Sequence, residues 1–179
     1  MINFASNLLI FITGYNFNYI QDIIEMRNLE DGVKYYAEVH TSFWNSLIHT
    51  VFMPLTMVGM YLWIPALFNL NNDKAIQLKE STMIFYIGLY SKISFVNTIV
   101  IMNIFFYPFI YSTELYRILY NNNAKYCFIY GFGISFVSLS IQEIIGHYIG
   151  GDAPSRLEAI PNAILYAKYY SVSHLLELK

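Results

Sequence analysis

Four histidines are the residues of this chain best suited to metal chemistry: His40, His49, His147 and His174. Imidazole is the commonest metal ligand in proteins, and its protonation changes near neutral pH. Several imidazoles with a carboxylate suit ferrous iron, zinc or copper. Glu143 lies four residues before His147, so a helix would place both on one face. The histidines therefore predict a metal site, although a lone histidine at a helix end more often caps the helix or lies at an interface.

The small number of ligands limits which metal sites can be built. Cys127 is the only cysteine, so neither an intramolecular disulfide nor a cysteine-based zinc site is available. Paired-iron lipid hydroxylases and desaturases need many more histidines than the four in this chain. A two-iron, histidine-rich centre is therefore nearly excluded.

The composition indicates the surroundings of such a site. Of the 179 residues, 56% are hydrophobic and 12% are charged, whereas soluble domains average roughly 25% charged residues. A soluble domain of this size could not bury so much apolar surface in one core, and the mean hydropathy of +0.43 agrees. We therefore predict a single integral membrane domain over residues 1–179. The net charge of −2 gives no basis for nucleic-acid binding.

The apolar segments predict an all-α bundle of about four transmembrane helices with flanking interfacial helices. Segment 48–70 carries no charge and is the clearest span, because roughly 20 apolar residues cross the hydrocarbon core. The apolar stretch 82–112 is too long for one span and would place Lys92 inside the membrane, which is costly. Two helices over 75–90 and 95–116, with a turn at Ser91 and Lys92, fit better. Segment 126–149 is the fourth span.

The segments outside these spans are predicted to flank the bundle, which occupies residues 33–177. Residues 1–32 form an N-terminal flank with a short amphipathic helix. A less hydrophobic helix over 157–178 lies at the membrane interface or packs on the mouth of the bundle. No basic residue precedes the N-terminal apolar run, so we expect no cleaved signal peptide.

The turn near Lys92 decides whether the histidines meet. His49 begins the first span and His147 lies near the end of the fourth. If residues 75–116 cross the membrane twice, the fourth span returns to the side where the first began, and His40, His49 and His147 lie on one face. If they cross once, His147 lies on the opposite face. His40 and His49 converge only if the helix breaks between them, or if a partner lies between their faces.

Two motifs carry a resemblance to a known family. The first is HTSFWNSLIHTVFMPL, residues 40–55, with the pattern His-x4-Asn-x3-His-x4-Pro. The second is QEIIGHYIGGDAPSRLEAIPNAI, residues 142–164, with Gln-x3-Gly-His followed by a loop containing proline. Together they resemble the 2-hydroxy-fatty-acid dioxygenase family, and the similarity extends over nearly the whole chain.

The resemblance implies an iron(II)-dependent α-oxidation of 2-hydroxy long-chain fatty acids. Molecular oxygen is the second substrate, carbon one leaves as CO2, and the reaction belongs to phytosphingosine breakdown at the endoplasmic reticulum. His40, His49 and His147 would be iron ligands, with Asn45 and Gln142 as supporting residues. His174 would be a fourth nitrogen near the metal. The acyl chain would lie among the membrane helices, where its methylenes avoid water.

The chain departs from the family pattern at one carboxylate. Where many members have Glu, this chain has Gly151, and Asp152 follows one residue later. Asp152, Glu143 or Glu158 could supply the missing carboxylate.

The substrate carboxylate would in turn need a cation. Arg156 and Lys168 lie near the proposed face. Both are also explained as ordinary positive charges flanking a membrane segment.

Two rival functions follow from the same residues. A non-catalytic lipid-binding, scaffold or transport protein predicts histidines that are dispersed in space. A zinc hydrolase predicts a histidine cluster too, because spacing does not identify the metal. The distances among the three imidazoles therefore test the metal site, and metal analysis distinguishes the enzymes.

Overall fold

The computed structural model describes residue 37 and residues 40–92, 94–152 and 160–177, and every regular element in these ranges is a helix. The helices are α4 (Phe43–Leu67), α5 (Asn72–Ser91), α6 (Phe95–Asn122), α7 (Ala124–Ser140), the π-helix η1 (Ile141–Gly146), α8 (His147–Gly150) and α9 (Ile160–Glu177). The predicted all-α bundle is thus confirmed. The expectations for the N-terminal flank, Arg156 and Glu158 lie outside the described residues.

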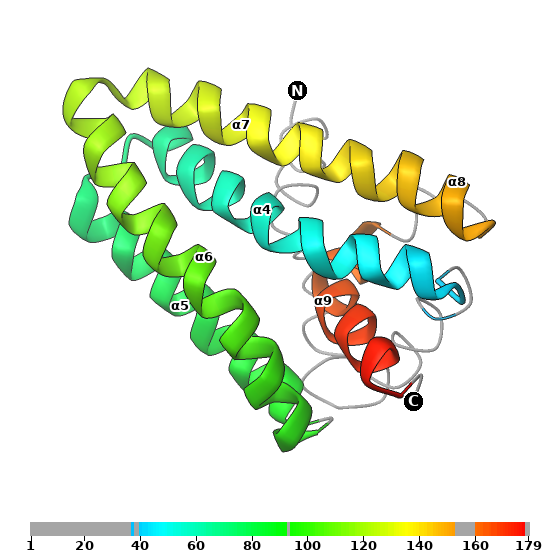
Figure 1. The fold of residues 1–179 in the computed structure, drawn as a ribbon. Coiled ribbons are helices and arrows are strands. Elements are labelled where there is room, and N and C mark those ends of the chain that lie inside the picture. Colours follow the sequence, from blue (N-terminus) through cyan, green and yellow to red (C-terminus); the bar gives the residue numbers. More distant parts are fainter. Residues whose placement is uncertain (1–36, 38–39, 93, 153–159, 178–179) are drawn as a thin grey trace, which may run out of the picture.

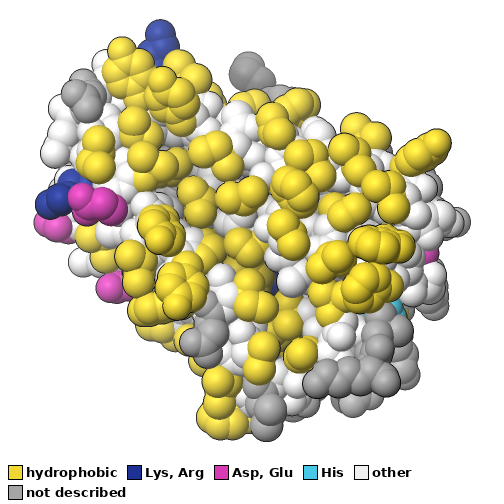
Figure 2. Space-filling model, viewed as in Figure 1, with side chains coloured by type: hydrophobic (Ala, Val, Ile, Leu, Met, Phe, Trp, Pro, Cys, Tyr) yellow, Lys and Arg dark blue, Asp and Glu magenta, His cyan; other side chains and the backbone are white. Residues whose placement is uncertain are grey.

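Three stretches of helix are long and apolar enough to cross a membrane: Phe43–Leu67, Asn97–Asn121 and Ala124–Gly150. They overlap the predicted spans 48–70, 95–116 and 126–149, with ends that differ by up to five residues. Figure 2 shows hydrophobic side chains over most of one face of the molecule, while charged side chains gather at the end where α6 is followed by α7. Such an exposed apolar surface is typical of a protein that has lipid as its solvent.

Helix α5 differs from the other predicted spans. It forms over Asn72–Ser91, as expected for 75–90, but it is not among the three stretches that satisfy the length and hydropathy of a span. Its first half carries the four charged residues Asp73, Lys74, Lys79 and Glu80. The structure therefore supports a helix at this position and three apolar spans by length and composition.

The predicted turn at Lys92 is present. Helix α5 ends at Ser91 with Lys92 as its C-cap, and α6 begins at Phe95 after Ser94 caps it by accepting a hydrogen bond from the Asn97 backbone. The two helices run side by side in opposite directions (Figure 1). The chain therefore reverses here, which is the condition under which His49 and His147 reach the same end of the bundle.

The helices form two antiparallel pairs that diverge from one end of the molecule. Helix α4 packs along α7, and α5 packs along α6 (Figure 1). Helix α9 lies between the diverging pairs and contacts α4 and α6. The last helix, predicted at the interface or on the bundle mouth, thus packs between the other helices.

The α4–α7 contact depends on a glycine. A Cβ atom added to Gly131 would lie 2.6 Å from the backbone nitrogen of Trp63 and 2.7 Å from the carbonyl oxygen of Gly59, which is too close for any side chain. A Cβ atom on Gly133, two residues later, would meet no atom within 4 Å. Small residues at such a crossing let membrane helices approach closely.

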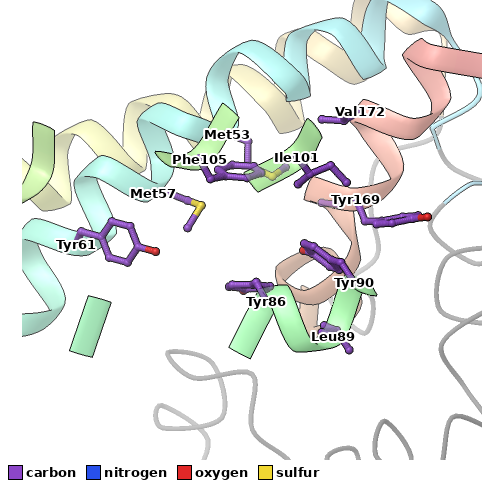
Figure 3. Close-up of a cluster of buried hydrophobic side chains, with 11 residues drawn as sticks. Met53, Met57, Tyr61, Tyr86, Leu89, Tyr90, Ile101, Phe105, Tyr169 and Val172 are labelled. Carbon is purple, nitrogen blue, oxygen red and sulfur yellow. The ribbon is translucent and has the colours of Figure 1, made fainter. Parts of the chain in front are cut away.

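The core between α4, α5, α6 and α9 is rich in aromatic and methionine side chains. Met53 and Met57 of α4 lie in one buried cluster with Tyr86 and Tyr90 of α5 and Phe105 of α6 (Figure 3). Ala167, Tyr169 and Val172 add the inner face of α9 to this cluster. The core thus fixes α9 against the bundle, next to the end of α4 that carries the histidines.

Candidate metal centre

Three of the four histidines meet at one end of the α4–α7 pair. His40 precedes α4, His49 lies in its second turn, and His147 follows the π-helix η1. All three side chains are buried, with at most 3% of their surface exposed. Each offers one ring nitrogen, and these atoms lie within 4.8 Å of one another. The predicted convergence of His40, His49 and His147 is therefore present.

The break that His40 and His49 needed is the start of helix α4. The helix begins at Phe43 after Ser42, so His40 lies before the helix. The helical repeat therefore does not fix its direction relative to His49. The ring centroids of His40 and His49 are 4.7 Å apart, and those of His40 and His147 are also 4.7 Å apart. His40 thus stands between the other two imidazoles.

The helix before His147 is locally wound as a π-helix over Ile141–Gly146. Single π turns inside α-helices are rare and are frequent at functional sites. Gln142 in this segment and His147 directly after it are nearly inaccessible to solvent, while Glu143 stays partly exposed. No local sequence signal predicted the π turn.

Gln142 connects His49 to polar groups of α4 and α7. Its amide nitrogen donates to the Thr56 hydroxyl at 2.8 Å and to the Ser138 carbonyl at 3.0 Å. A side-chain hydrogen bond also links Gln142 to His49. Because the amide nitrogen is engaged, the amide oxygen is the atom that accepts from the imidazole N–H. Such a bond fixes the ring and selects which nitrogen can ligate a metal. Thr56 is a supporting residue that the sequence did not reveal.

Asp152 fastens the end of α8 to the start of α4. Its carboxylate accepts hydrogen bonds from the Thr41 hydroxyl at 2.7 Å, the Asn45 side-chain amide at 2.8 Å, and the backbone N–H groups of Thr41 and Ser42 at 3.3 Å. Ser42 makes no side-chain cap of its own. Partial burial raises the pKa of Asp152, but these hydrogen bonds outweigh it and hold the pKa below its ordinary value.

Gly151 forms the turn that precedes Asp152. It ends α8 in the left-handed region, with φ of 72°. Glycine is the favoured residue there because it has no Cβ atom to clash. The turn brings Asp152 beside the start of α4. Its hydrogen bonds to Thr41, Ser42 and Asn45 are called the Asp152 clasp, and they lie next to His40 in the chain. Among the described residues it is not part of the three-histidine group.

Glu143 approaches the centre through His147. Its carboxylate oxygen lies 3.6 Å from Nε2 of His147, and 40% of its side chain is exposed. In the described part of the chain, Nδ1 of His147 is buried and makes no hydrogen bond. At 3.6 Å the contact with Glu143 is a close approach and not a hydrogen bond, and Nε2 of His147 also makes no hydrogen bond within the described residues. The geometry therefore places Glu143 next to one of the three clustered histidines.

The structure does not bring His174 into the group. Its ring stacks on Tyr170, with centroids 5.2 Å apart. The Tyr170 hydroxyl donates to the His40 carbonyl oxygen at 3.2 Å. The last helix thus reaches the centre through Tyr170, which the sequence did not single out.

Lys168 lies in a pocket formed by residues of α4, α5, α6 and α9, and none of the three histidines lines it. The expectation that it attends the substrate carboxylate at the histidine face is therefore not supported by its position.

Comparison of the chain with protein-family models, with curated proteins and with solved structures gives no match. The family resemblance of segments 40–55 and 142–164 accordingly stays a prediction. The site itself rests on geometry, namely three buried imidazoles held by an amide network and a carboxylate clasp.

Proposed function

We propose that the three-histidine group binds ferrous iron and that the protein is a dioxygenase for 2-hydroxy long-chain fatty acids. The observation that carries this proposal is the approach of three buried imidazole nitrogens to within 4.8 Å of one another. Histidine side chains are rarely gathered in an apolar interior without a ligand to share. Their position at the end of membrane helices suits a substrate with a polar head and an apolar chain.

The donor set fits a metal ion. Ligand atoms at about 2.0–2.1 Å from one ion lie at most about 4.2 Å apart, so the observed spacing needs only small ring movements. Imidazole ligands suit iron, zinc and copper. His147 contributes a buried Nδ1 that makes no hydrogen bond in the described part of the chain. Three protein ligands leave open positions for substrates.

The proposed reaction balances without an external reductant. A 2-hydroxy acid and one O2 give the acid shortened by one carbon, CO2 and water; the bond between carbons one and two breaks, and four electrons pass to oxygen. Bound iron would supply the oxygen chemistry and positions for the carboxylate and hydroxyl of the acid. His40, His49 and His147 would hold the ion, Gln142 would orient His49, and Glu143 would orient His147 and is the nearest group able to accept a proton.

The apolar surface supports a membrane-embedded substrate. The three apolar helices favour a substrate that remains in the bilayer with its chain among lipid tails. Residence in the endoplasmic reticulum and a role in sphingolipid breakdown rest on the family resemblance alone. We include both in the proposal.

A zinc hydrolase is the second candidate, because three histidines with an open position are also a known catalytic zinc set. Zinc would lower the pKa of a bound water molecule toward neutrality, with Glu143 as the nearest carboxylate. This enzyme would need no oxygen. The choice therefore depends on metal content and oxygen consumption, which the imidazole geometry leaves open.

Oxygen uptake with 2-hydroxypalmitate tests the proposal. The full chain is placed in neutral phospholipid nanodiscs with Fe(II), and uptake is measured together with release of labelled CO2 from carbon one. We expect one CO2 for each O2, and no reaction with palmitate, which lacks the hydroxyl. His49→Ala should abolish turnover, and His174→Ala should retain it. An iron-loaded, folded protein that consumes no oxygen would favour the non-catalytic lipid-binding function.

A further inference from the structure

Helix α9 contacts the segment that carries His40 through the side chain of Tyr170. The Tyr170 hydroxyl donates a hydrogen bond to the backbone carbonyl oxygen of His40 at 3.2 Å, across 130 residues of sequence. The Tyr170 ring packs against the core cluster and stacks on His174, with ring centroids 5.2 Å apart. Tyr169 and Val172 of the same helix belong to that cluster (Figure 3). Packed neighbours therefore hold Tyr170, so its hydroxyl can fix the position of the His40 backbone.

The backbone of His40 depends on contacts of this kind, because His40 precedes α4 and lies outside the helix. Its N–H donates to the carbonyl oxygen of Ala37 at 3.2 Å. The Asp152 clasp holds the two residues that follow His40 from the end of α8. Tyr170 holds the His40 carbonyl group from α9. Two elements that are distant in sequence from His40 thus contact the short segment that carries it.

His40 is the middle imidazole of the three-histidine group. Its ring centroid lies 4.7 Å from that of His49 and 4.7 Å from that of His147, whereas those two centroids are 5.9 Å apart. A displacement of the His40 backbone would therefore change its distance to both neighbours. Metal–ligand distances in proteins hold to within about 0.2 Å, so even a small displacement would weaken a shared metal ion.

We infer that Tyr170 is a positioning residue of the three-histidine centre, and that through its bond to His40 the docking of α9 and the binding of a metal ion strengthen each other. The inference rests on the metal-binding part of the proposed function and requires no oxygen chemistry. Coupling between two binding events is reciprocal. A docked α9 therefore raises metal affinity, and a bound metal ion stabilises the docked α9. Tyr170 acts through the His40 backbone and does not itself ligate the metal.

Titration of the full chain in phosphatidylcholine nanodiscs with Co(II), whose visible absorption reports its ligands, tests the inference. Tyr170→Phe keeps the ring and its stacking on His174 but removes the hydroxyl. We expect its Kd for Co(II) to rise about 2–10-fold, the effect of one lost hydrogen bond. Tyr169→Phe is the matched control, because this neighbouring hydroxyl on α9 pairs with the Asn97 side chain at 3.4 Å. The control should bind Co(II) as tightly as the unmodified chain.

Amide hydrogen exchange measures the coupling from the side of α9. Co(II) should slow exchange in α9 of the unmodified chain, and the effect should be smaller in Tyr170→Phe. If Tyr170 only stabilised the fold, the variant would exchange faster by the same factor with and without Co(II), and its Kd would not change. The comparison of the unmodified chain with and without Co(II) needs no variant, so a folding defect in Tyr170→Phe leaves the inference testable.

Three results would overturn the inference. They are equal Kd values for Co(II) in Tyr170→Phe and Tyr169→Phe, exchange in α9 that Co(II) does not slow, and no binding of Co(II) by the folded, unmodified chain. The last result would remove the metal centre as well. A chain that shows the expected differences with Co(II) but consumes no oxygen with Fe(II) would support the inference and contradict the dioxygenase. The two failures are therefore distinguishable.

Discussion

Asp152 and Asn45 are joined by a 2.8 Å hydrogen bond across 107 residues of sequence. The same carboxylate holds Thr41 and Ser42, which directly follow His40. The contact therefore ties the end that carries His147 to the segment that carries His40. Asp152, expected as a ligand or base, forms hydrogen bonds here that join two histidine-bearing segments.

Removing this clasp should loosen both the fold and the centre. Asp152→Ala removes the acceptor of the hydrogen bonds from Thr41, Ser42 and Asn45, which costs about 1–3 kcal/mol. We expect a lower midpoint of thermal unfolding in detergent and weaker metal binding. Glu80→Ala is the control, since Glu80 is exposed on α5 and lies far from the clasp in sequence. An unchanged midpoint in Asp152→Ala would contradict the structural role.

Acid should weaken the same contact. The folded pKa of Asp152 lies below its unfolded value, which is about 3.9 for aspartate. Its contribution is therefore complete above that unfolded pKa and is lost as the pH falls through the lower folded pKa. Stability measured between neutral pH and about pH 3 should fall less steeply in Asp152→Asn than in the unmodified chain. Parallel curves would show that the carboxylate contributes no pH-dependent stability.

The Gln142 network should tune metal affinity. Gln142→Met keeps the volume of the side chain but removes the bond to His49 and the donation to Thr56. Loss of a partner that orients a ligand typically weakens metal binding by about 10–100-fold. Titration with Fe(II) or Co(II) measures this change, and Thr56→Val should produce a smaller one. Equal affinities for Gln142→Met and the unmodified protein would remove Gln142 from the centre.

The α4–α7 crossing offers a matched pair of substitutions. Gly131→Ala places a methyl group against the backbone of α4, whereas Gly133→Ala enters open space. Overpacking of this kind costs about 1–3 kcal/mol. Gly131→Ala should therefore unfold at a lower temperature than Gly133→Ala. Both substitutions change helix propensity equally, so the difference measures the steric contact alone. Equal midpoints of thermal unfolding for the two variants would contradict the close approach of α4 and α7 at Gly131.

Much of the site was predictable because it follows from chain reversal. Burying the charge of Lys92 inside a span is energetically costly, which predicts a turn beside it. That turn brings His147 to the end of the bundle where His49 lies. The positions of charged residues and the lengths of apolar stretches can be read directly from the sequence. His40 was also placed correctly once a helix break before His49 was allowed.

The remaining features depend on tertiary contacts. The π turn before His147 has no propensity signature, and the role of Thr56 appears only when α4 and the π-helix pack. Asp152 was identified as a carboxylate near the centre, but its hydrogen bonds come from residues over one hundred positions away. His174 was grouped with the other histidines by residue type, whereas the packing of α9 stacks it on Tyr170 instead.

The central claim is that His40, His49 and His147 form one metal centre, and iron stoichiometry tests it most directly. The full chain is reconstituted anaerobically with Fe(II), freed of excess metal and analysed for iron per chain. One ion per chain is expected for the unmodified protein and for His174→Ala, and none for the triple variant His40→Ala, His49→Ala, His147→Ala. Equal iron in the triple variant and the unmodified protein, or no iron in a folded unmodified protein, would contradict the account.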